Sequence, residues 1–141
     1  SMFPALKNAE FLRYGVMHKN TYINAPKVLN ADFSMKQHPT VYFAGQITGV
    51  EGYVESTASG LVAAINLDRR LCGKEPLALT SETVIGALAN YVATPNSDFQ
   101  PMNANYGVLK PLLTKPKKKA DKKRLLSERA IEKIKEIKES L

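Results

Sequence analysis

The sequence predicts an α/β fold, and one strand–loop–helix unit carries most of that prediction. Residues 40–44 form a β-branched and aromatic run typical of a buried strand. A glycine-rich stretch follows at 45–53, and apolar residues then recur at helical spacing over 54–70. Further helical patterns cover 84–92 and about 121–141. Together these patterns predict a small sheet with helices packed against it.

The composition is that of a folded domain without a membrane helix or a disulfide framework. Of 141 residues, 44% are hydrophobic and 23% are charged, close to the globular average. No apolar run approaches the ~18–20 residues of a membrane helix, and no secretory segment follows the first residues, which we interpret as an expression scar at Ser1-Met2. The single cysteine, Cys72, excludes an internal disulfide and a multi-cysteine zinc site, and it indicates a reducing cytoplasm. His18 and His38 are too far apart to predict a metal site, so we expect none.

The first third of the chain predicts short extended elements. Alternating residues over 16–24 predict a strand that Pro26 stops. Residues 27–37 then predict a short extended piece or a hairpin around Val28-Leu29. The buried strand expected at 40–44 comes next and leads into the glycines.

Two helices are expected after the glycine-rich loop. Over 54–70, Ser59 and Gly60 allow close packing, while Gly73 is a good stop just past the helix end. The second helix should be capped by Thr80 or Ser81 and should end at 94–96. Its apolar face is formed by Val84, Ile85, Leu88, Tyr91 and Val92.

The last third of the chain predicts a loop and then a long helix. Residues 95–111 are rich in Asn and Pro, so we expect a loop with a short helical turn at most. From about 121 to 141 an apolar stripe predicts a helix docked on its own domain rather than a coiled coil. The stripe consists of Leu126, Ala130, Ile134, Ile137 and Leu141.

The glycine-rich loop is the main candidate for a binding site. A strand that runs through glycines into a helix lets backbone N–H groups approach an anion, which suits a nucleotide or a flavin over the start of the 54–70 helix. The alternative is a tight turn without a ligand. The spacing is neither G-x-G-x-x-G nor a Walker motif, and the acidic Glu51 argues against a bare triphosphate.

Two features beside the loop have open interpretations. Tyr53 could stack on a planar ring, although from the residues alone a core aromatic is favoured. Glu51 and Glu55, one helical turn apart, could form an acid–base pair, but more often such a pair favours the helix dipole. Cys72 lacks a nearby histidine, so a nucleophilic role is not expected.

The whole net charge lies in one segment, residues 110–124, which we call the basic segment. It holds eight basic residues against Asp121, which equals the net charge of +7. Such a segment attracts polyanions such as RNA, although a solvated linker is an equal alternative. The segment contains no aromatic residue, so it should contact phosphates rather than stack on bases. Its candidate RNA contacts are Lys110, Lys115, Lys117, Lys118, Lys119, Lys122, Lys123 and Arg124.

Three ordered motifs resemble one enzyme family. They are FPAL at 3–6 with RYGVMHKNTYIN at 13–24, YFAGQITGVEGYVES at 42–56, and FQPMNANYG at 99–107. Together they resemble the bacterial folate- and FAD-dependent tRNA (uracil-5-)-methyltransferases, TrmFO. The middle motif is shared in looser form with the related tRNA-modifying flavoprotein GidA, but VEGY and PMNAN favour the methyltransferases.

The resemblance implies the C-terminal part of a Rossmann-like FAD-binding, GidA-type fold, with an incomplete sheet and C-terminal helices. The family's N-terminal FAD fingerprint and its catalytic cysteines have no counterpart here, so no catalytic residue is expected in this chain. The implied parts are the end of an inserted substrate domain at 3–37, the closing strand–loop–helix of the FAD domain at 38–72, a helical and loop region at 73–109, the basic segment at 110–124, and a C-terminal helix at 125–141.

The resemblance also implies a reaction, its cofactors and its partners. The parent enzyme would make 5-methyluridine in the tRNA T-loop, with methylenetetrahydrofolate as carbon donor, reduced FAD as reductant, and NAD(P)H to reduce the flavin. The alternatives are a GidA-type wobble-uridine enzyme and a non-catalytic RNA-binding module. The partners would be tRNA and the remainder of the parent chain, with a homodimer through exposed surface as a further expectation. The implied flavin-facing residues are Gly45, Gln46, Gly49, Val50, Glu51, Gly52 and Tyr53.

Overall fold

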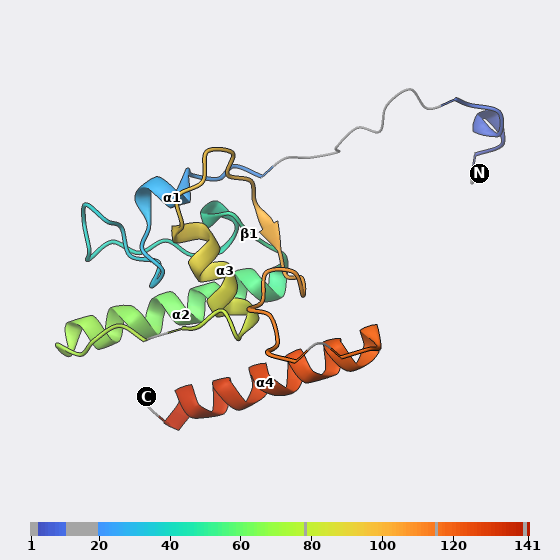
Figure 1. Cartoon of the computed structure of the whole chain (residues 1–141). Coiled ribbons are helices and arrows are strands. Elements are labelled where there is room, and N and C mark those ends of the chain that lie inside the picture. The colour runs from blue at the N-terminus through green and yellow to red at the C-terminus, as the bar shows by residue number, and fades with distance from the viewer. Residues whose placement is uncertain (1–2, 11–19, 78, 115, 140) are drawn as a thin grey trace.

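The computed structural model describes residues 3–10, 20–77, 79–114, 116–139 and 141 (Figure 1). The elements in chain order are a 3₁₀ turn at Pro4–Leu6, α1 (Ala25–Val28), a 3₁₀ turn at Gly45–Thr48, β1 (Val50–Glu51), α2 (Tyr53–Leu71), α3 (Val84–Ala93), β2 (Met102–Asn103) and α4 (Lys119–Glu139). Helices and a small parallel sheet are therefore combined, in agreement with the α/β prediction.

Helix α2 forms where the periodicity predicts it. Its inner face buries Ser59, Val62, Ala63 and Asn66. The helix ends at Leu71, and Gly73 follows in the left-handed conformation with φ of 68°. The N–H of Gly73 donates to the carbonyl of Arg70, which satisfies one of the last carbonyls of the helix.

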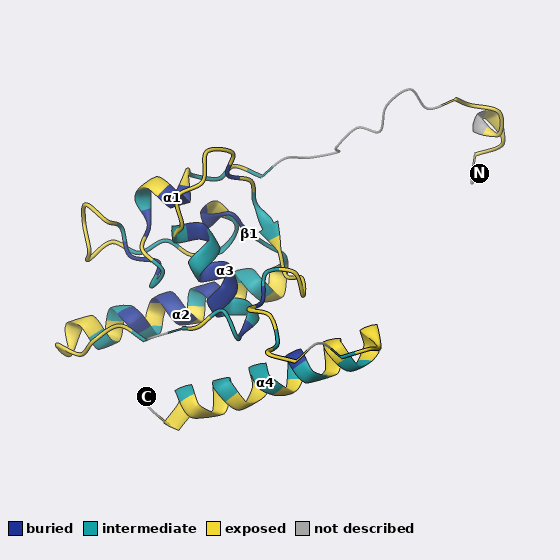
Figure 2. Cartoon of the chain, in the orientation of Figure 1, coloured by how far each residue is buried: buried dark blue, intermediate teal, exposed yellow. Residues whose placement is uncertain are grey.

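Helix α3 is the most buried element and contacts both α1 and α2 (Figure 2). Its cap differs from the prediction: the hydroxyl of Thr83, rather than Thr80 or Ser81, accepts from the N–H of Gly86 at 3.1 Å. Thr83 is extended, with φ of −108° and ψ of 152°, as a residue that precedes a helix must be. The predicted end of the helix is confirmed, since Thr94 follows Ala93 as the C-cap.

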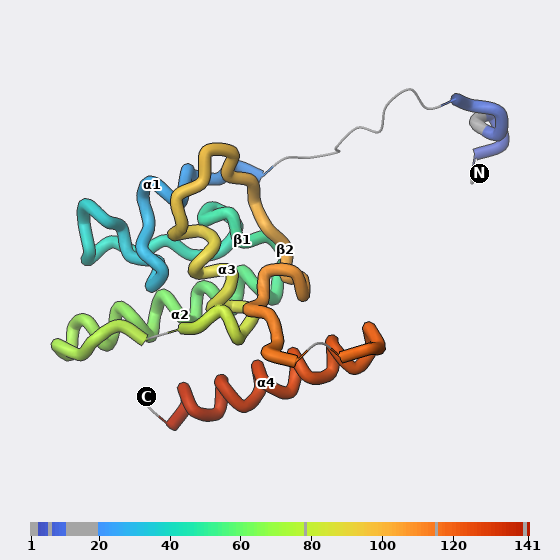
Figure 3. Tube along the Cα trace, viewed as in Figure 1, coloured from blue at the N-terminus to red at the C-terminus, as the bar shows by residue number. Residues whose placement is uncertain are grey.

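The sheet consists of β1 and β2, which lie side by side and run parallel (Figure 3). Val50 pairs with Met102 and Glu51 with Asn103. Neither strand is predictable from its sequence, because one falls within the glycine-rich stretch and the other within the Asn- and Pro-rich loop. Two residues are too few to show the alternation that indicates a strand.

The prediction of a buried strand at 40–44 was wrong. This segment is mostly exposed, and its contact with the preceding chain is one antiparallel bridge between Ser34 and Tyr42. A strand needs hydrogen-bonded neighbours along its length, and among the described residues the pairing is limited to 33–35: Met35 N–H donates to the carbonyl of Val41, and Phe43 N–H donates to that of Phe33.

The other extended elements are only partly present. Residues 16–19 of the strand expected at 16–24 lie outside the described residues, and residues 20–24 form no strand. Pro26 lies in the first turn of α1 instead of ending a strand. The hairpin expected over 27–37 is confirmed only in part: Leu29 and Met35 form an antiparallel bridge, whereas Lys27 and Val28 belong to helix α1.

The main core lies between α1, α2, α3 and β1. Phe99, from the loop after α3, joins these elements because its ring meets that of Tyr22 edge-on at 6.0 Å and that of Tyr91 at 5.5 Å. The buried members of the core are Ala25, Leu29, Phe33, Val50, Val62, Ala63, Leu88, Ala89, Val92 and Phe99.

Helix α4 docks on the rest of the chain near its beginning, where it contributes to a second and smaller hydrophobic cluster. Leu126 is 1% exposed and packs with Ala87 of α3 and with Leu109. Ile131 and Ile134, farther along, remain exposed. The prediction of a docked helix is confirmed for the first half of α4. Because the helix begins at Lys119, the second part of the basic segment is helical rather than a linker.

Candidate functional site

The glycine-rich loop adopts a conformation that depends on its glycines. Gly45, Gly49 and Gly52 have φ of 77°, 87° and 93°, in the left-handed region that other residues rarely enter. A 3₁₀ turn spans Gly45–Thr48, and the buried Thr48 hydroxyl donates to the carbonyl of Gly45 at 2.7 Å. The loop is therefore a compact turn that delivers the chain directly into β1 and α2.

Two serines of α2 fasten the loop to the helix. The hydroxyl of Ser59, fully buried, accepts from the N–H of Gly45 at 2.8 Å and donates to the carbonyl of Ser56 at 2.7 Å. The Ser56 hydroxyl donates to the carbonyl of Val50 at 3.1 Å. From the sequence, Ser59 was expected only to allow close packing; the signal for its hydrogen bonds is its spacing of three from Ser56, which places both serines on one helical face.

Gly49 is required by packing against Phe99. A Cβ atom at position 49 would lie 2.5 Å from Cζ of Phe99, which is too close for any side chain. The side chain of Val50 is fully buried in the core, so only the Val50 backbone can face a ligand. Packing within the chain therefore accounts for the residue types at two positions of the predicted flavin-facing set, Gly49 and Val50.

Glu55 joins the start of α2 to the segment after β2. Its Oε1 accepts from the backbone N–H of Ala104 at 2.9 Å. Gly52 is favoured by its φ of 93°, and a Cβ atom there would lie 2.3 Å from the Glu55 carboxylate and displace that flexible side chain. Glu51 lies in β1 and not on the helix, so the two carboxylates do not share a helical face as the acid–base hypothesis requires.

The first turn of α2 is open to solvent. No side chain in the described part of the chain caps it, and Gly52 precedes it. Its leading N–H groups therefore remain available to an acceptor. Tyr53 is 88% exposed, so the interpretation as a core aromatic was wrong and a stacking role stays open.

An apolar cleft runs between α2 and α3. It has a volume of about 430 Å³ and is lined by Val54, Glu55, Ala58, Val84, Ile85, Leu88 and Ala104. The exposed face of α2 continues it, with Val54 80% and Leu61 63% exposed. Neither residue was distinguished from the buried face by sequence periodicity.

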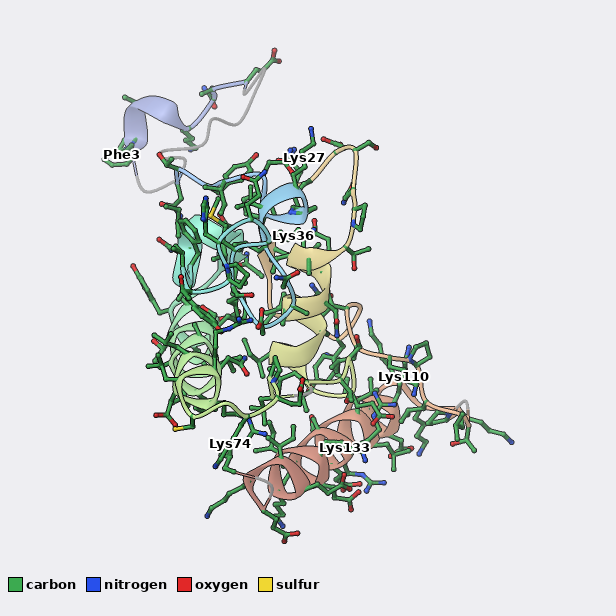
Figure 4. All side chains as sticks on the ribbon, turned by 90° about the vertical axis from the view of Figure 1, so that its left-hand side faces the viewer. Phe3, Lys27, Lys36, Lys74, Lys110 and Lys133 are labelled. Atoms are coloured by element: carbon green, nitrogen blue, oxygen red, sulfur yellow. The ribbon has the colours of Figure 1, made fainter. Side chains whose placement is uncertain are left out.

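The basic segment is divided between a loop and the first turns of α4. Lys110 lies beside α4, far from Lys27 and Lys36 at the other end of the molecule (Figure 4). Its ammonium group is 3.5 Å from the carboxylate of Glu82. Arg124 pairs with Glu128 at 2.9 Å. Lys115 is outside the described residues.

Arg129 fixes the course of the basic segment. Its guanidinium group donates to the carbonyls of Lys110 at 2.5 Å and Pro111 at 3.1 Å. Lys110 N–H in turn donates to the carbonyl of Ser81 at 2.7 Å. The start of the basic segment is therefore held between α4 and the turn before α3.

Within the described residues, no group of His, Cys, Asp and Glu could hold a metal ion. Cys72 is a free, exposed thiol at the end of α2. The described helices also include none that is long and apolar enough to cross a membrane.

The chain is similar in sequence to several curated proteins that share one name. The chain is 55% identical over 138 residues to the methylenetetrahydrofolate–tRNA-(uracil-5-)-methyltransferase TrmFO of Desulfitobacterium hafniense, which covers 97% of this chain and 32% of that protein. It is 50% identical over 138 residues to the protein of the same name from Caldicellulosiruptor bescii, covering 96% and 32%. For the Thermotoga maritima protein the identity is 53% over 135 residues, covering 95% and 31%. The chain thus spans about a third of the length of these curated relatives.

A solved structure and a family profile complete the comparison. The crystal structure of Aquifex aeolicus GidA in crystal form II aligns with a TM-score of 0.45 and 33% identity, over 48% of this chain and 12% of that one. The sequence profile described as glucose inhibited division protein A matches residues 1–75. Because the match covers more than half of the 141 residues of this chain, the chain belongs to the glucose inhibited division protein A family.

Proposed function

We propose that this chain is the C-terminal part of a folate- and FAD-dependent tRNA methyltransferase that makes 5-methyluridine in the T-loop. The observation that carries the proposal is the 50–55% identity, over nearly the whole chain, to proteins named methylenetetrahydrofolate–tRNA-(uracil-5-)-methyltransferase. The activity belongs to the whole protein. This chain would contribute one wall of the cofactor site and an RNA-binding surface.

The start of α2 fits a flavin better than the rest of the loop does. Its uncapped first turn carries a partial positive charge that stabilises a negatively charged or electron-rich group. Gly52 brings the backbone close without a side chain, and the exposed Tyr53 ring can lie on a planar ligand. Gly45, Gln46 and Glu51 would complete the edge of the site, whereas Gly49 and Val50 shape it from within.

The bound flavin would supply electrons, from NAD(P)H, to reduce the carbon that methylenetetrahydrofolate donates. The residues of this chain would orient and shield it. The Ser56 and Ser59 hydroxyls hold the loop in register with α2, and Glu55 holds the segment after β2 against the helix start. With these contacts the loop keeps one shape before the cofactor arrives, which lowers the conformational entropy lost on binding.

The remaining two-thirds of the protein would cover the apolar face of α2. Val54 and Leu61 lie on this face beside the cleft lined by Val84, Ile85 and Leu88. A surface this apolar is unusual at a solvated helix face. We assign it to the contact that completes a Rossmann-like, GidA-type domain, of which 38–72 is the closing unit and 3–37 the end of an inserted domain.

The proposal can be tested with a chimera. This chain would replace the matching segment of the Desulfitobacterium hafniense relative, and the purified chimera would be assayed for flavin absorbance and for 5-methyluridine in a T-arm RNA. We expect both. A chimera that retains flavin but forms no 5-methyluridine with methylenetetrahydrofolate and NAD(P)H would overturn the proposal, and modification of a wobble uridine instead would favour the GidA-type alternative.

The isolated chain is the matched control for the chimera. We expect it neither to retain FAD in stoichiometric amount nor to methylate RNA, because the other wall of the cofactor site is absent. A yellow isolated chain with one FAD per molecule would show that this chain alone forms the flavin site.

The basic segment specifically favours RNA binding by the isolated chain as a second, non-catalytic function. Phosphate contacts make affinity fall steeply as salt rises. Replacement of Lys117, Lys118 and Lys119 with Ala should therefore weaken tRNA binding and flatten its salt dependence. Unchanged binding would eliminate this function.

A further inference from the structure

Folding places an aromatic ring beside the basic segment, which contains none of its own. The ring is that of Tyr106, in the turn after β2. The ammonium group of Lys123 lies 5.4 Å from its centroid, within the range of a cation–π contact. The Tyr106 hydroxyl is 3.2 Å from the Ser127 hydroxyl, one helical turn along α4 from Lys123. Tyr106 nevertheless remains 44% exposed.

The turn that carries Tyr106 is internally fastened. The Asn105 side-chain oxygen accepts from the N–H of Gly107 at 2.8 Å, and its amide donates to the carbonyl of Asn103 at 2.9 Å. Only Ala104 and Asn105 separate the ring from β2, and the N–H of Ala104 donates to Glu55. The ring is therefore held in a defined place, on the segment that connects the basic surface to the start of α2.

Several lysines of the basic segment have no ion-pair partner among the described residues. Lys110 and Arg124 each have a carboxylate partner. In the described part of the chain, no ion pair forms at the exposed residues Lys117, Lys118, Lys119 and Lys122. Lys119 and Lys122 also lie at the beginning of α4, where the helix dipole disfavours positive charge. Bound phosphates would offset both the mutual repulsion and the dipole term.

We propose that Tyr106 is a stacking platform for one unpaired base of a bound RNA, with Lys117, Lys118, Lys119 and Lys122 on the adjacent phosphates. This inference rests on the proposed function for the identity of the RNA. Sequence-specific or loop-directed RNA recognition uses bases that are splayed out and stacked on aromatic rings. A base in a continuous duplex has no free face, so the platform selects an RNA loop over a paired stem. Lys123, on the ring, would add its charge to the same contact.

The test measures binding of a labelled T-arm hairpin RNA to the 141-residue chain at two salt concentrations. We expect Tyr106→Ala to lower affinity about 5- to 100-fold at both concentrations, because stacking is largely independent of salt. Replacing Lys117, Lys118 and Lys119 with Ala should instead flatten the salt dependence. A fully paired RNA of the same composition should bind more weakly and should not respond to Tyr106→Ala.

Two variants separate stacking from a structural role of the hydroxyl. Tyr106→Phe keeps the ring and removes the contact with Ser127, and Ser127→Ala removes the same contact from the other side; both should bind the hairpin like the original chain. A loss in Tyr106→Phe equal to that in Tyr106→Ala would overturn the inference. So would an unchanged affinity in Tyr106→Ala, or an equal effect of this change on the paired RNA.

The outcome is independent of the methyltransferase assay. A chimera without methyl transfer, beside a chain whose hairpin binding depends on Tyr106, would overturn the proposed function and leave the stacking platform standing. Methyl transfer by the chimera, together with a hairpin affinity that does not depend on Tyr106, would support the proposed function and overturn the stacking platform.

Discussion

At the residue scale, Gly49 and Phe99 decide whether the glycine-rich loop can close on the core. We expect Gly49→Ala to destabilise the chain by about 2–4 kcal/mol, because two costs add up: alanine is strained in the left-handed conformation, and its Cβ atom overlaps a neighbouring ring. The overlap is the 2.5 Å approach of the new Cβ to Cζ of Phe99. The free energy of unfolding from urea titration, followed by circular dichroism, measures the loss.

Gly60 provides the matched control for Gly49. It lies inside α2, and a Cβ atom there would meet nothing within 4 Å. Gly60→Ala should therefore stabilise the chain by about 0.5–1 kcal/mol, because alanine loses less backbone entropy in a helix. Equal effects of the two substitutions would show that the contact with Phe99 does not form.

At the element scale, the start of α3 distinguishes the observed cap from the one that the sequence predicted. Removing the Thr83 hydroxyl with Thr83→Ala should lower the free energy of unfolding by about 1 kcal/mol, because the N–H of Gly86 loses its acceptor. Thr80→Ala should have a smaller effect, since the Thr80 hydroxyl accepts only a long 3.4 Å bond from Glu82 N–H. If thermal unfolding showed a larger loss of stability for Thr80→Ala than for Thr83→Ala, Thr80 would be the cap, as the sequence predicted.

The docking of α4 depends on one side chain near its beginning. Leu126→Ala should destabilise the chain by about 2–4 kcal/mol, because it leaves a cavity against Ala87 and Leu109. Ile131→Ala, on the same helix but 57% exposed, should change stability by less than about 1 kcal/mol. Hydrogen exchange of α4 amides would report the difference, and equal protection in the two variants would contradict this docking.

At the scale of the whole molecule, the exposed face of α2 should be needed for assembly but not for folding. Leu61→Glu should leave the melting temperature of the isolated chain nearly unchanged and abolish flavin retention in the chimera. Val62→Glu, at the neighbouring buried position, should unfold the isolated chain, because a charge cannot enter this core without a partner. Flavin retention by the Leu61→Glu chimera would show that the partner surface lies elsewhere.

The same face gives the expected homodimer its location. In isolation, the apolar surface around Leu61 is free to associate with a second copy of the chain. Sedimentation velocity should then show a concentration-dependent dimer that Leu61→Glu shifts to monomer. A monomer at all concentrations would eliminate the homodimer.

Elements with long local patterns were predictable, and elements that depend on a neighbour were not. Helices α2 and α4 follow from periodicity, and Gly73 marks the end of α2 through its own preference for positive φ. The run at 40–44 has strand-forming residues but little to pair with, while Val50 and Met102 form a strand pair without any local signal. The candidate flavin loop was found from its glycines, but the roles of Ser59 and Glu55 were not.

The sequence alone is enough to predict α2, α3 and α4, the glycine-rich turn, the confinement of the net charge to 110–124, and the family resemblance, but not the short helix α1. These properties reside in local conformational preference or in composition. The tertiary structure alone decided that Gly49 is needed for Phe99, that Tyr53 faces solvent, and that Tyr106 lies against Lys123. Each of these is a contact or an exposure set by residues distant along the chain, and it exists only because packing of the core brings those residues together or leaves them apart.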